Sequence, residues 1–252
     1  MQDAPTRLFG LIGFPLAHSF SKKFFSEKFD AEGLAHCRYE LFPMESPEGL
    51  EALLAAHPQL EGLNVTIPHK EAVIPLLDHL DDEARQVGAV NTIKIRGGKL
   101  IGFNTDVYGF EFSLRDFVLK SKYEHPTGAL ILGTGGASKA VAFVLGKMGI
   151  RYHFVSRKKK PGTLTYKDLT ASTIAAHQLL VNTTPLGTYP KVEECLPIPY
   201  EQLDDRHLLF DLVYNPGKTL FLANGERQGC QICNGLRMLE LQAERAWEIW
   251  NS

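Results

Sequence analysis

Short apolar segments rich in β-branched residues alternate with amphipathic helical patterns along almost the whole chain. This alternation is typical of α/β proteins, whose helices connect the strands of mostly parallel sheets. In the N-terminal part the pattern predicts strands at 7–13, 37–43 and 62–68, helices at 19–34 and 46–57, a helical stretch around 71–88, and two strands within 89–105.

Local signals support two of these elements. Ser46 and Pro47 are typical N-cap and first-turn residues for the helix at 46–57. The dipeptide Gly97–Gly98 predicts a hairpin turn between the two strands of 89–105. We expect the helical stretch at 71–88 to be interrupted, or to start again, near Asp81 and Asp82.

A second series of elements begins after the segment 106–120. The connection from the strand at 151–156 to the next apolar segment contains Pro161–Gly162 and little helical pattern. A parallel crossover usually needs a dozen residues or more, so we expect an added strand around 163–167 or a single helical turn at 170–177. The other elements predicted in this part are strands at 128–133, 151–156, 179–183, 208–213 and 229–233 and helices at 135–149 and 235–250.

The fold class that follows is α/β with two domains. One domain with a mixed, mostly parallel sheet is predicted for 1–105 together with the returning helix at 236–252. The other, with a shortened crossover, is predicted for 106–235.

Composition narrows the range of partners. The 252 residues are 44% hydrophobic and 22% charged, with 27 basic and 29 acidic residues and a net charge of −2. This balance argues against a nucleic-acid or membrane-surface binder, which needs a strongly basic face, and favours a small-molecule partner. No apolar run is long enough for a membrane span and the N-terminus lacks a signal-peptide pattern, so we expect a cytoplasmic protein. We expect it to be a monomer or a homodimer.

The four cysteines are expected to be free thiols. Cys230 and Cys233 form a CxxC pair within a strand-like segment, so buried inert thiols are the favoured interpretation and a redox sensor is the alternative. Histidine, cysteine and acidic residues do not cluster with metal-ligand spacing, and no metal is predicted.

A glycine loop follows the apolar strand at 128–133 and opens a helix. In GTGGAS, Gly133 suits a tight turn and Gly135 lets a pyrophosphate approach the backbone at a helix N-terminus. A glycine-rich turn without a ligand is the alternative. The strand, loop and helix order favours a dinucleotide site.

The next strand end indicates which dinucleotide binds. Where an NAD site has an acidic residue for the ribose hydroxyls, this chain has Ser156, Arg157 and Lys158 to Lys160. Cations and a hydroxyl suit the 2′-phosphate of NADP through charge-assisted hydrogen bonds. A solvated basic loop is the alternative.

Lys70 lies just after the third strand, and Asn91 and Asp106 also fall at strand ends. Ligands of open α/β sheets collect beyond the carboxyl ends of strands, so these side chains are candidates for one site. Lys70 paired with Asp106 could exchange a proton with a substrate hydroxyl while a hydride moves to a nicotinamide. An ordinary salt bridge at a domain edge is the alternative, and His69 is a less favoured alternative base.

Taken together, ordered motifs resemble the shikimate dehydrogenase family over nearly the whole length. They are GFPLAHSFS, GLNVTIPHKE, GAVNT, GFNTD, GTGGASKA, VNTTPLG, DLVYNP and NGLRMLELQA. The resemblance implies an NADP-dependent enzyme that interconverts 3-dehydroshikimate and shikimate, on the route to chorismate and the aromatic amino acids. The domain over 1–105 and 236–252 would be the substrate-binding, catalytic domain, and the domain over 106–235 a Rossmann-like dinucleotide-binding domain for NADP. We expect the active site between the two domains.

The resemblance also implies roles for individual residues. Lys70 and Asp106 would be the catalytic pair, with Lys70 transferring the proton. The substrate-binding residues would be Ser19, Ser21, Asn64, Thr66, Asn91, Thr105, Tyr214 and Gln242. The cofactor-binding residues would be Gly133, Gly135, Gly136, Ala137, Ser156, Arg157, Lys158, Thr183, Leu212, Gly235 and Met238.

Three positions depart from the family pattern. Ser156 replaces an asparagine, and Val107 and Arg237 stand where glycine is usual. An NAD-using quinate or dual-specificity dehydrogenase is the nearest alternative, and the basic residues after the second strand speak against it. A catalytically silent paralogue that senses shikimate-like ligands is a further alternative.

Overall fold

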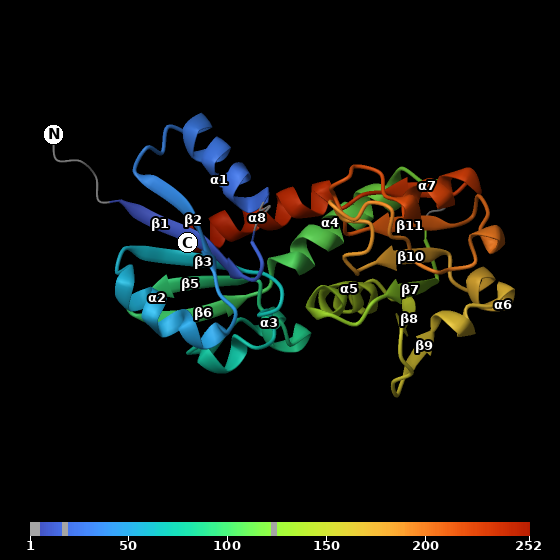
Figure 1. Cartoon of the computed structure of the whole chain (residues 1–252), viewed down its shortest axis with the longest axis horizontal. Helices are drawn as coiled ribbons and strands as arrows, with labels where there is room; N and C mark the ends of the chain where they lie inside the picture. The colour runs from blue at the N-terminus through green and yellow to red at the C-terminus, as the bar shows by residue number, and fades with distance from the viewer. Residues whose placement is uncertain (1–5, 17–19, 122–124) are drawn as a thin grey trace. The chain divides into compact units, whose positions relative to one another are not determined.

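The computed structural model describes residues 6–16, 20–121 and 125–252. The chain divides into two compact units, Met1–Thr105 with Gln242–Ser252 (unit 1) and Asp106–Leu241 (unit 2). Among the described residues, no helix is long and apolar enough to cross a membrane. Figure 1 shows the whole chain, and the two units are described one at a time.

Unit 1 is built on a mixed six-stranded sheet with the order β2-β1-β3-β5-β6-β4. β1 pairs in parallel with β2 and β3, whereas β5 is antiparallel to both β3 and β6. This mixed sheet confirms the predicted fold class for this part. Its strands are β1 (Arg7–Gly13), β2 (Cys37–Pro43), β3 (Leu60–Val65), β4 (His79–Leu80), β5 (Thr92–Arg96) and β6 (Lys99–Phe103).

Alternate residues of β1 point to opposite faces of this sheet, and each face has its own core. Leu8 and Ile12 pack with Leu50 of α2 (Leu50–Ala56), which the 3-10 turn Pro47–Gly49 directly precedes. Phe9 and Leu11 instead pack with α1 (Phe20–Ala31) and with the last turns of α8 (Leu236–Asn251). Figure 1 shows α1 and α2 on opposite sides of the strands.

The helical stretch expected at 71–88 is wrong in its first half. The structure has a 3-10 turn at Ile74–Leu76, the short strand β4, and helix α3 only at Asp82–Val87. Pro75 cannot donate an intrahelical hydrogen bond, and the Asp78 carboxylate instead accepts the backbone N–H of Leu100 at 2.9 Å. The chain is thereby held beside β6 before α3 begins.

Three local predictions in unit 1 are confirmed: the Gly97–Gly98 turn, the Ser46 cap and a new helix start near Asp81 and Asp82. Gly97 and Gly98 have φ values of 57° and 75°, as a two-residue hairpin turn between β5 and β6 requires. Ser46 caps the turn that precedes α2 by accepting the Glu48 N–H at 3.4 Å. Asp81 caps α3 through the Glu83 N–H at 3.0 Å.

Unit 2 contains a six-stranded parallel sheet with the order β12-β11-β10-β7-β8-β9. The order places β7 centrally, with the chain running outward first on one side and then on the other, as in Rossmann folds. The strands are β7 (Gly128–Leu132), β8 (Arg151–Ser156), β9 (Thr163–Thr165), β10 (Leu179–Asn182), β11 (Leu208–Asp211) and β12 (Gln231–Cys233).

The shortened crossover is confirmed, and both of its expected elements are present. β9 pairs only with the last residues of β8, in the register Phe154↔Thr163 to Ser156↔Thr165. β9 has only three residues and pairs with the end of β8, so the chain has little distance to cover and the short loop after Ser156 is long enough to connect the two strands. Helix α6 (Ala171–Ala175) then leads to β10, with Thr170 as its N-cap.

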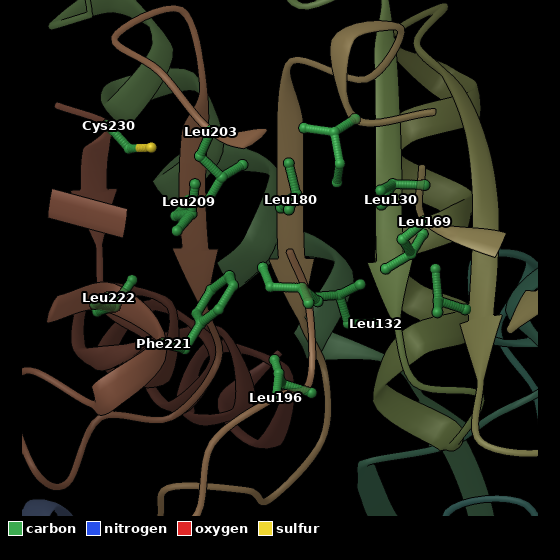
Figure 2. Close-up of a cluster of buried hydrophobic side chains, with 13 residues drawn as sticks. Leu130, Leu132, Leu169, Leu180, Leu196, Leu203, Leu209, Phe221, Leu222 and Cys230 are labelled. Carbon is green, nitrogen blue, oxygen red and sulfur yellow. The ribbon is translucent and has the colours of Figure 1, made fainter. Parts of the chain in front are cut away.

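Helices cover both faces of this sheet. Leu130, Leu180 and Leu209 of three adjacent strands pack with Phe221 and Leu222 of α7 (Leu220–Arg227), a helix that the sequence pattern did not predict. Figure 2 shows these side chains on one side of β7, β10 and β11. The opposite face is covered by α5 (Gly136–Lys147) and α4 (Thr105–Leu119), whose Phe110 ring contacts the Phe210 ring.

Candidate functional site

In unit 1 a set of buried polar side chains lies beyond the apolar core. We call it the substrate-side network: it consists of Asn64, Asn91, Thr92, Thr105 and Gln242. All five are at most 7% exposed. Asn64 comes from β3, Thr92 opens β5 and Thr105 follows β6, so adjacent strands bring them together. Four of the eight predicted substrate-binding residues therefore belong to one cluster.

Asn91 is the centre of this network. Its Oδ1 accepts the Thr105 N–H at 2.7 Å and the Thr92 hydroxyl at 3.1 Å, while its Nδ2 donates to Thr105 Oγ1 at 3.0 Å and to Gln242 Oε1 at 3.4 Å. Asn64 Nδ2 donates to Thr92 Oγ1 at 3.2 Å. Neutral amides and hydroxyls that fix one another in this way suit recognition of a ligand with several hydroxyl groups.

Tyr39 connects this network to α1. Its hydroxyl donates to Asn64 Oδ1 at 2.7 Å, and the Ser21 side chain also hydrogen-bonds it. Burial raises the pKa of Tyr39 well above its ordinary value, so the phenol stays protonated. Ser21, a predicted substrate-binding residue, is thus connected to Asn64 through the Tyr39 side chain. Ser19 lies outside the described residues.

Lys70 lies five residues beyond the end of β3, on a segment that a backbone hydrogen bond fixes beside Val90. Its carbonyl oxygen accepts the Val90 N–H at 2.7 Å, next to Asn91. The neighbouring His69 is 1% exposed and its Nε2 lies 2.5 Å from the Met44 carbonyl oxygen, so it donates there. His69 is therefore buried and hydrogen-bonded to the backbone, which disfavours it as a base.

Thr66 and Asp106 complete the first group of predicted residues. The Thr66 N–H donates to the Ile12 carbonyl at 2.9 Å, and a side chain at Gly13 would collide with the Thr66 methyl group. Asp106 is 6% exposed in the first turn of α4 and directly follows Thr105 in the chain. Tyr214 is half-buried just after β11 in unit 2.

In unit 2 the glycine loop has the features that a pyrophosphate site needs. Gly133 has a φ of 125°, in the range that favours glycine, and a Cβ there would lie 2.6 Å from Thr183 Oγ1. Gly135 is the N-cap of α5, and among the described side chains none caps the amides of its first turn. An open loop at the N-terminus of a twelve-residue helix fits an anionic group over Gly136 and Ala137.

The basic loop, residues 157–160, lies beside the glycine loop because β8 pairs with β7. All four of its side chains are exposed, whereas Ser156 is only 9% exposed and accepts the Lys158 N–H at 3.4 Å. Lys160 reaches across and donates to Thr134 Oγ1 of the glycine loop at 3.2 Å. The structure therefore brings the predicted pyrophosphate and 2′-phosphate residues together.

The residues predicted for the nicotinamide end lie at the next strand ends. Thr183 follows β10 and its hydroxyl donates to the Leu132 carbonyl at 2.9 Å. A Cβ on Gly235 would collide with the Leu212 carbonyl, so only glycine fits there. Met238 is 7% exposed, about one helical turn further along α8. The chain brings Leu212 and Gly235 into contact, and Thr183 next to Gly133.

Sequence reasoning missed a buried carboxylate at this edge of the sheet. Asp211 accepts from Thr219 Oγ1 at 2.6 Å, Asn182 Nδ2 at 2.8 Å and the Val213 N–H at 2.9 Å. Burial raises the pKa of Asp211 to about 6, and the three hydrogen bonds oppose that rise. An acidic residue that ends an apolar strand, as in LLFD, was the available signal.

The four cysteines are free thiols, as predicted. Burial raises the pKa of Cys230 to about 12 and that of Cys233 to about 11, which is opposite to the change that makes a thiol reactive. In the described part of the chain, no group of three or more His, Cys, Asp or Glu residues could hold a metal ion.

Comparison with known proteins agrees with this geometry. The family model for the shikimate dehydrogenase substrate binding domain matches residues 11–93. Over 96% of its length the chain is 38% identical to a shikimate dehydrogenase (NADP(+)) of Clostridium beijerinckii, 91% of which it covers. The chain belongs to the shikimate dehydrogenase family. The family that the ordered motifs predict is thereby confirmed.

Solved structures of the shikimate dehydrogenase family have the same fold. The enzyme of Aquifex aeolicus is 34% identical with a TM-score of 0.86, and the match covers all of this chain and 94% of that one. The enzyme of Thermus thermophilus, solved with NADP(H) and shikimate, is 31% identical with a TM-score of 0.83, covering 97% and 93% of the two chains.

The departures from the shikimate dehydrogenase pattern are accommodated locally. Val107 is buried, at 1% exposure, in the first turn of α4. Arg237 points its guanidinium toward solvent on α8, 3.6 Å from the Glu240 carboxylate. Ser156 keeps a polar side chain at the end of β8. Each fits within its own helix or strand.

Proposed function

We propose that this protein catalyses the NADP-dependent, reversible reduction of 3-dehydroshikimate to shikimate. The observation that carries the proposal is the substrate-side network, because a ring with several hydroxyls needs fixed neutral donors and acceptors. The resemblance assigned Asn64, Asn91, Thr105 and Gln242 to one substrate, and a single hydrogen-bonded cluster supports that assignment.

Substrate binding is divided between two kinds of group. Ser19, Ser21 and Tyr214 hold the carboxylate through hydroxyl donors, which form charge-assisted hydrogen bonds with it. Asn64, Thr66, Asn91, Thr105 and Gln242 orient the ring hydroxyls and the reacting carbon. Because the amides of the network are already fixed by one another, little conformational entropy is lost when the ring binds.

Proton transfer is the task of Lys70. Its ammonium group donates a proton to the carbonyl oxygen of 3-dehydroshikimate in the reductive direction, and its amine accepts that proton from shikimate in reverse. The resemblance pairs Asp106 with Lys70, and we assign Asp106 the role of orienting it. The backbone bond between Val90 and the Lys70 carbonyl supports a fixed position for the segment that carries it.

The cofactor residues of this chain fit NADP. When bound, NADPH supplies the hydride for the carbonyl carbon. Gly133, Gly135, Gly136 and Ala137 hold the pyrophosphate, and Ser156, Arg157 and Lys158 bind the 2′-phosphate side. Thr183, Leu212, Gly235 and Met238 line the nicotinamide end and exclude water there. The open first turn of α5 and the exposed cations beside it support this division.

The remaining expectations concern the setting of the enzyme. We place it in the cytoplasm, where free thiols persist. It acts as a monomer or a homodimer. Sedimentation of the purified protein at several concentrations separates these two states.

Initial rates with shikimate or quinate, each against NADP⁺ or NAD⁺, test the proposal. The appearance of reduced nicotinamide absorbance is the readout. We expect turnover with shikimate and NADP⁺ and much slower rates with the other three pairs. Comparable rates with quinate or NAD⁺ would move the protein to the dual-specificity class. A folded protein that binds shikimate without turnover would be a silent paralogue.

A further inference from the structure

Two buried hydroxyl groups in unit 1 lie outside the set of residues that the resemblance assigns. Tyr39 on β2 is 3% exposed and its ring stacks on Phe25, with the ring centroids 4.6 Å apart. Thr92 at the start of β5 is fully buried. Both form hydrogen bonds to predicted substrate-binding residues, Tyr39 to Ser21 and Asn64, and Thr92 to Asn64, Asn91 and Thr105.

The orientation of the Asn64 amide decides the direction of these bonds. Asn64 Nδ2 lies 3.4 Å from the Asn91 carbonyl oxygen and 3.2 Å from Thr92 Oγ1. A carbonyl oxygen only accepts, so the amide nitrogen has to face it. Asn64 Oδ1 therefore faces Tyr39, and the Tyr39 hydroxyl donates its proton to that oxygen at 2.7 Å.

The remaining protons follow from this assignment. Tyr39 has one hydroxyl proton, which is used by Asn64, so Ser21 has to donate in the bond between Ser21 and Tyr39. Thr92 accepts from Asn64 and donates to Asn91 Oδ1 at 3.1 Å. Four hydrogen bonds thus run in one direction, Ser21 to Tyr39, Asn64, Thr92 and Asn91.

We propose that Tyr39 and Thr92 are positioning residues for the substrate, which fix how Ser21, Asn64 and Asn91 present protons and lone pairs to it. This inference rests on the proposed function, because those three residues are its substrate-binding candidates. The same donor-to-acceptor direction continues beyond Asn91, whose Nδ2 donates to Thr105 Oγ1 and Gln242 Oε1. Turning one amide around would set donor against donor or acceptor against acceptor at its neighbours.

A bound carboxylate leaves most of this chain of bonds unchanged. It can take the Ser21 proton, which replaces a neutral hydrogen bond by a stronger charge-assisted one. Tyr39 then loses only an accepted bond and continues to donate to Asn64. Asn64 and Asn91 keep their orientation, so Tyr39 and Thr92 hold the ring-binding amides in place both before and after substrate binds.

The first test is Tyr39→Phe, which removes the hydroxyl and keeps the stacked ring. Asn64 Oδ1 is then buried without its donor, so we expect KM for shikimate to rise about tenfold. KM for NADP⁺ should stay within about twofold, since its candidate residues lie in unit 2. Tyr200→Phe is the matched control: it removes a hydroxyl that lies 3.0 Å from Cys195 Sγ in unit 2, and both KM values should stay unchanged.

Thr92 provides a second, independent pair of variants. Thr92→Val keeps the shape of the side chain and removes the hydroxyl, so KM for shikimate should again rise about tenfold. Thr92→Ser keeps the hydroxyl and should restore KM to within about threefold of the wild type. This pair of variants tests the proposed positioning role if Tyr39→Phe fails to fold.

The outcomes separate this inference from the function on which it rests. If Tyr39→Phe and Thr92→Val unfold at lower temperature but keep the wild-type KM for shikimate, the two residues are structural and the inference is wrong. A wild type with no turnover of shikimate overturns the proposed function and the inference together. Normal wild-type turnover with raised KM only in the hydroxyl-free variants is the expected result.

Discussion

Asn64, Asn91 and Thr105 of the substrate-side network are at most 4% exposed, whereas every side chain of the basic loop is exposed. The network is neutral and each of its groups is held by two or more hydrogen bonds. The basic loop has four cations, of which Lys159 pairs at 3.4 Å with Asp168 and Lys160 bonds Thr134.

The two regions therefore recognise their ligands by different physics. A buried neutral network loses much when one group is removed, because its partners stay buried without a hydrogen bond. Exposed cations act through water and salt, and neighbouring cations replace one another in part. We expect substitutions to act strongly and specifically in unit 1, and weakly and in a salt-dependent way in the basic loop.

The largest effect is expected from Lys70→Ala in unit 1. The variant lacks the group that transfers the proton, so kcat should fall at least about 100-fold. KM for shikimate should change far less, because the substrate-side network remains intact. Steady-state kinetics with the reduced-nicotinamide readout measure both quantities. Near-normal kcat would remove Lys70 from the chemistry and leave the network as a binding site only.

The titration of Asp211 tests whether burial gives a charged group of unit 2 a strong effect on stability, unlike the exposed cations of the basic loop. Its pKa is raised from 3.8 to about 6, so the native state binds the proton more tightly than the unfolded chain. Stability from this group is therefore present below pH 3.8 and is lost as the pH rises to about 6. The loss amounts to about 3 kcal/mol at most.

Asp211→Asn removes that titration. The free energy of unfolding of the wild type, measured relative to the variant by denaturant titration, should decrease as the pH rises through this range. Carboxylates with lowered pKa, such as Asp204 at about 2, are present in both proteins and cancel in the difference. A difference that does not change with pH would mean that the Asp211 pKa is ordinary.

The double variant Arg157→Ala, Lys158→Ala addresses the basic loop. Removing two exposed cations should raise KM for NADP⁺ about tenfold at low salt, with a smaller rise at high salt. KM for NAD⁺, which lacks the 2′-phosphate, should hardly change. The ratio of kcat/KM for the two cofactors is the measurement. An equal loss for both cofactors would show that the loop does not bind the 2′-phosphate.

Lys160→Met should have the smallest effect. Lys160 is exposed and donates to Thr134 of the glycine loop at 3.2 Å, so its loss changes one hydrogen bond and one screened charge. KM for NADP⁺ should rise about twofold. Lys167→Met, elsewhere in unit 2, is the matched control for removal of a lysine. A tenfold effect of Lys160→Met would place this lysine among the main cofactor contacts.

Much of the fold follows from the sequence because its signals are local. β1, β2 and β8 have the predicted boundaries, since each is an apolar run limited by turn residues. The first half of the stretch 71–88 was mispredicted because its polar residues are held by tertiary hydrogen bonds, such as that from the Leu100 N–H to Asp78. Helix α7 was missed because its short apolar face resembles a strand or loop segment.

The candidate site was predictable only in part. Asn91 directly precedes β5 and the glycine loop follows β7, positions that the pattern locates, whereas Lys70 lies five residues beyond β3. Tyr39 and Thr92 were missed because nothing in the sequence shows that a buried hydroxyl faces Asn64 rather than the apolar core. That information depends on the pairing of β1 with both β2 and β3, which brings distant segments together.

The most direct test of the contrast between the substrate-side network and the basic loop is the ionic-strength dependence of the wild-type KM values for shikimate and NADP⁺. Between about 20 and 300 mM salt, KM for NADP⁺ should rise severalfold, because exposed cations are screened over this range. KM for shikimate should rise much less, since the network proposed to bind its ring is buried and neutral. An equal rise in both values, or a salt-independent KM for NADP⁺, would contradict the account.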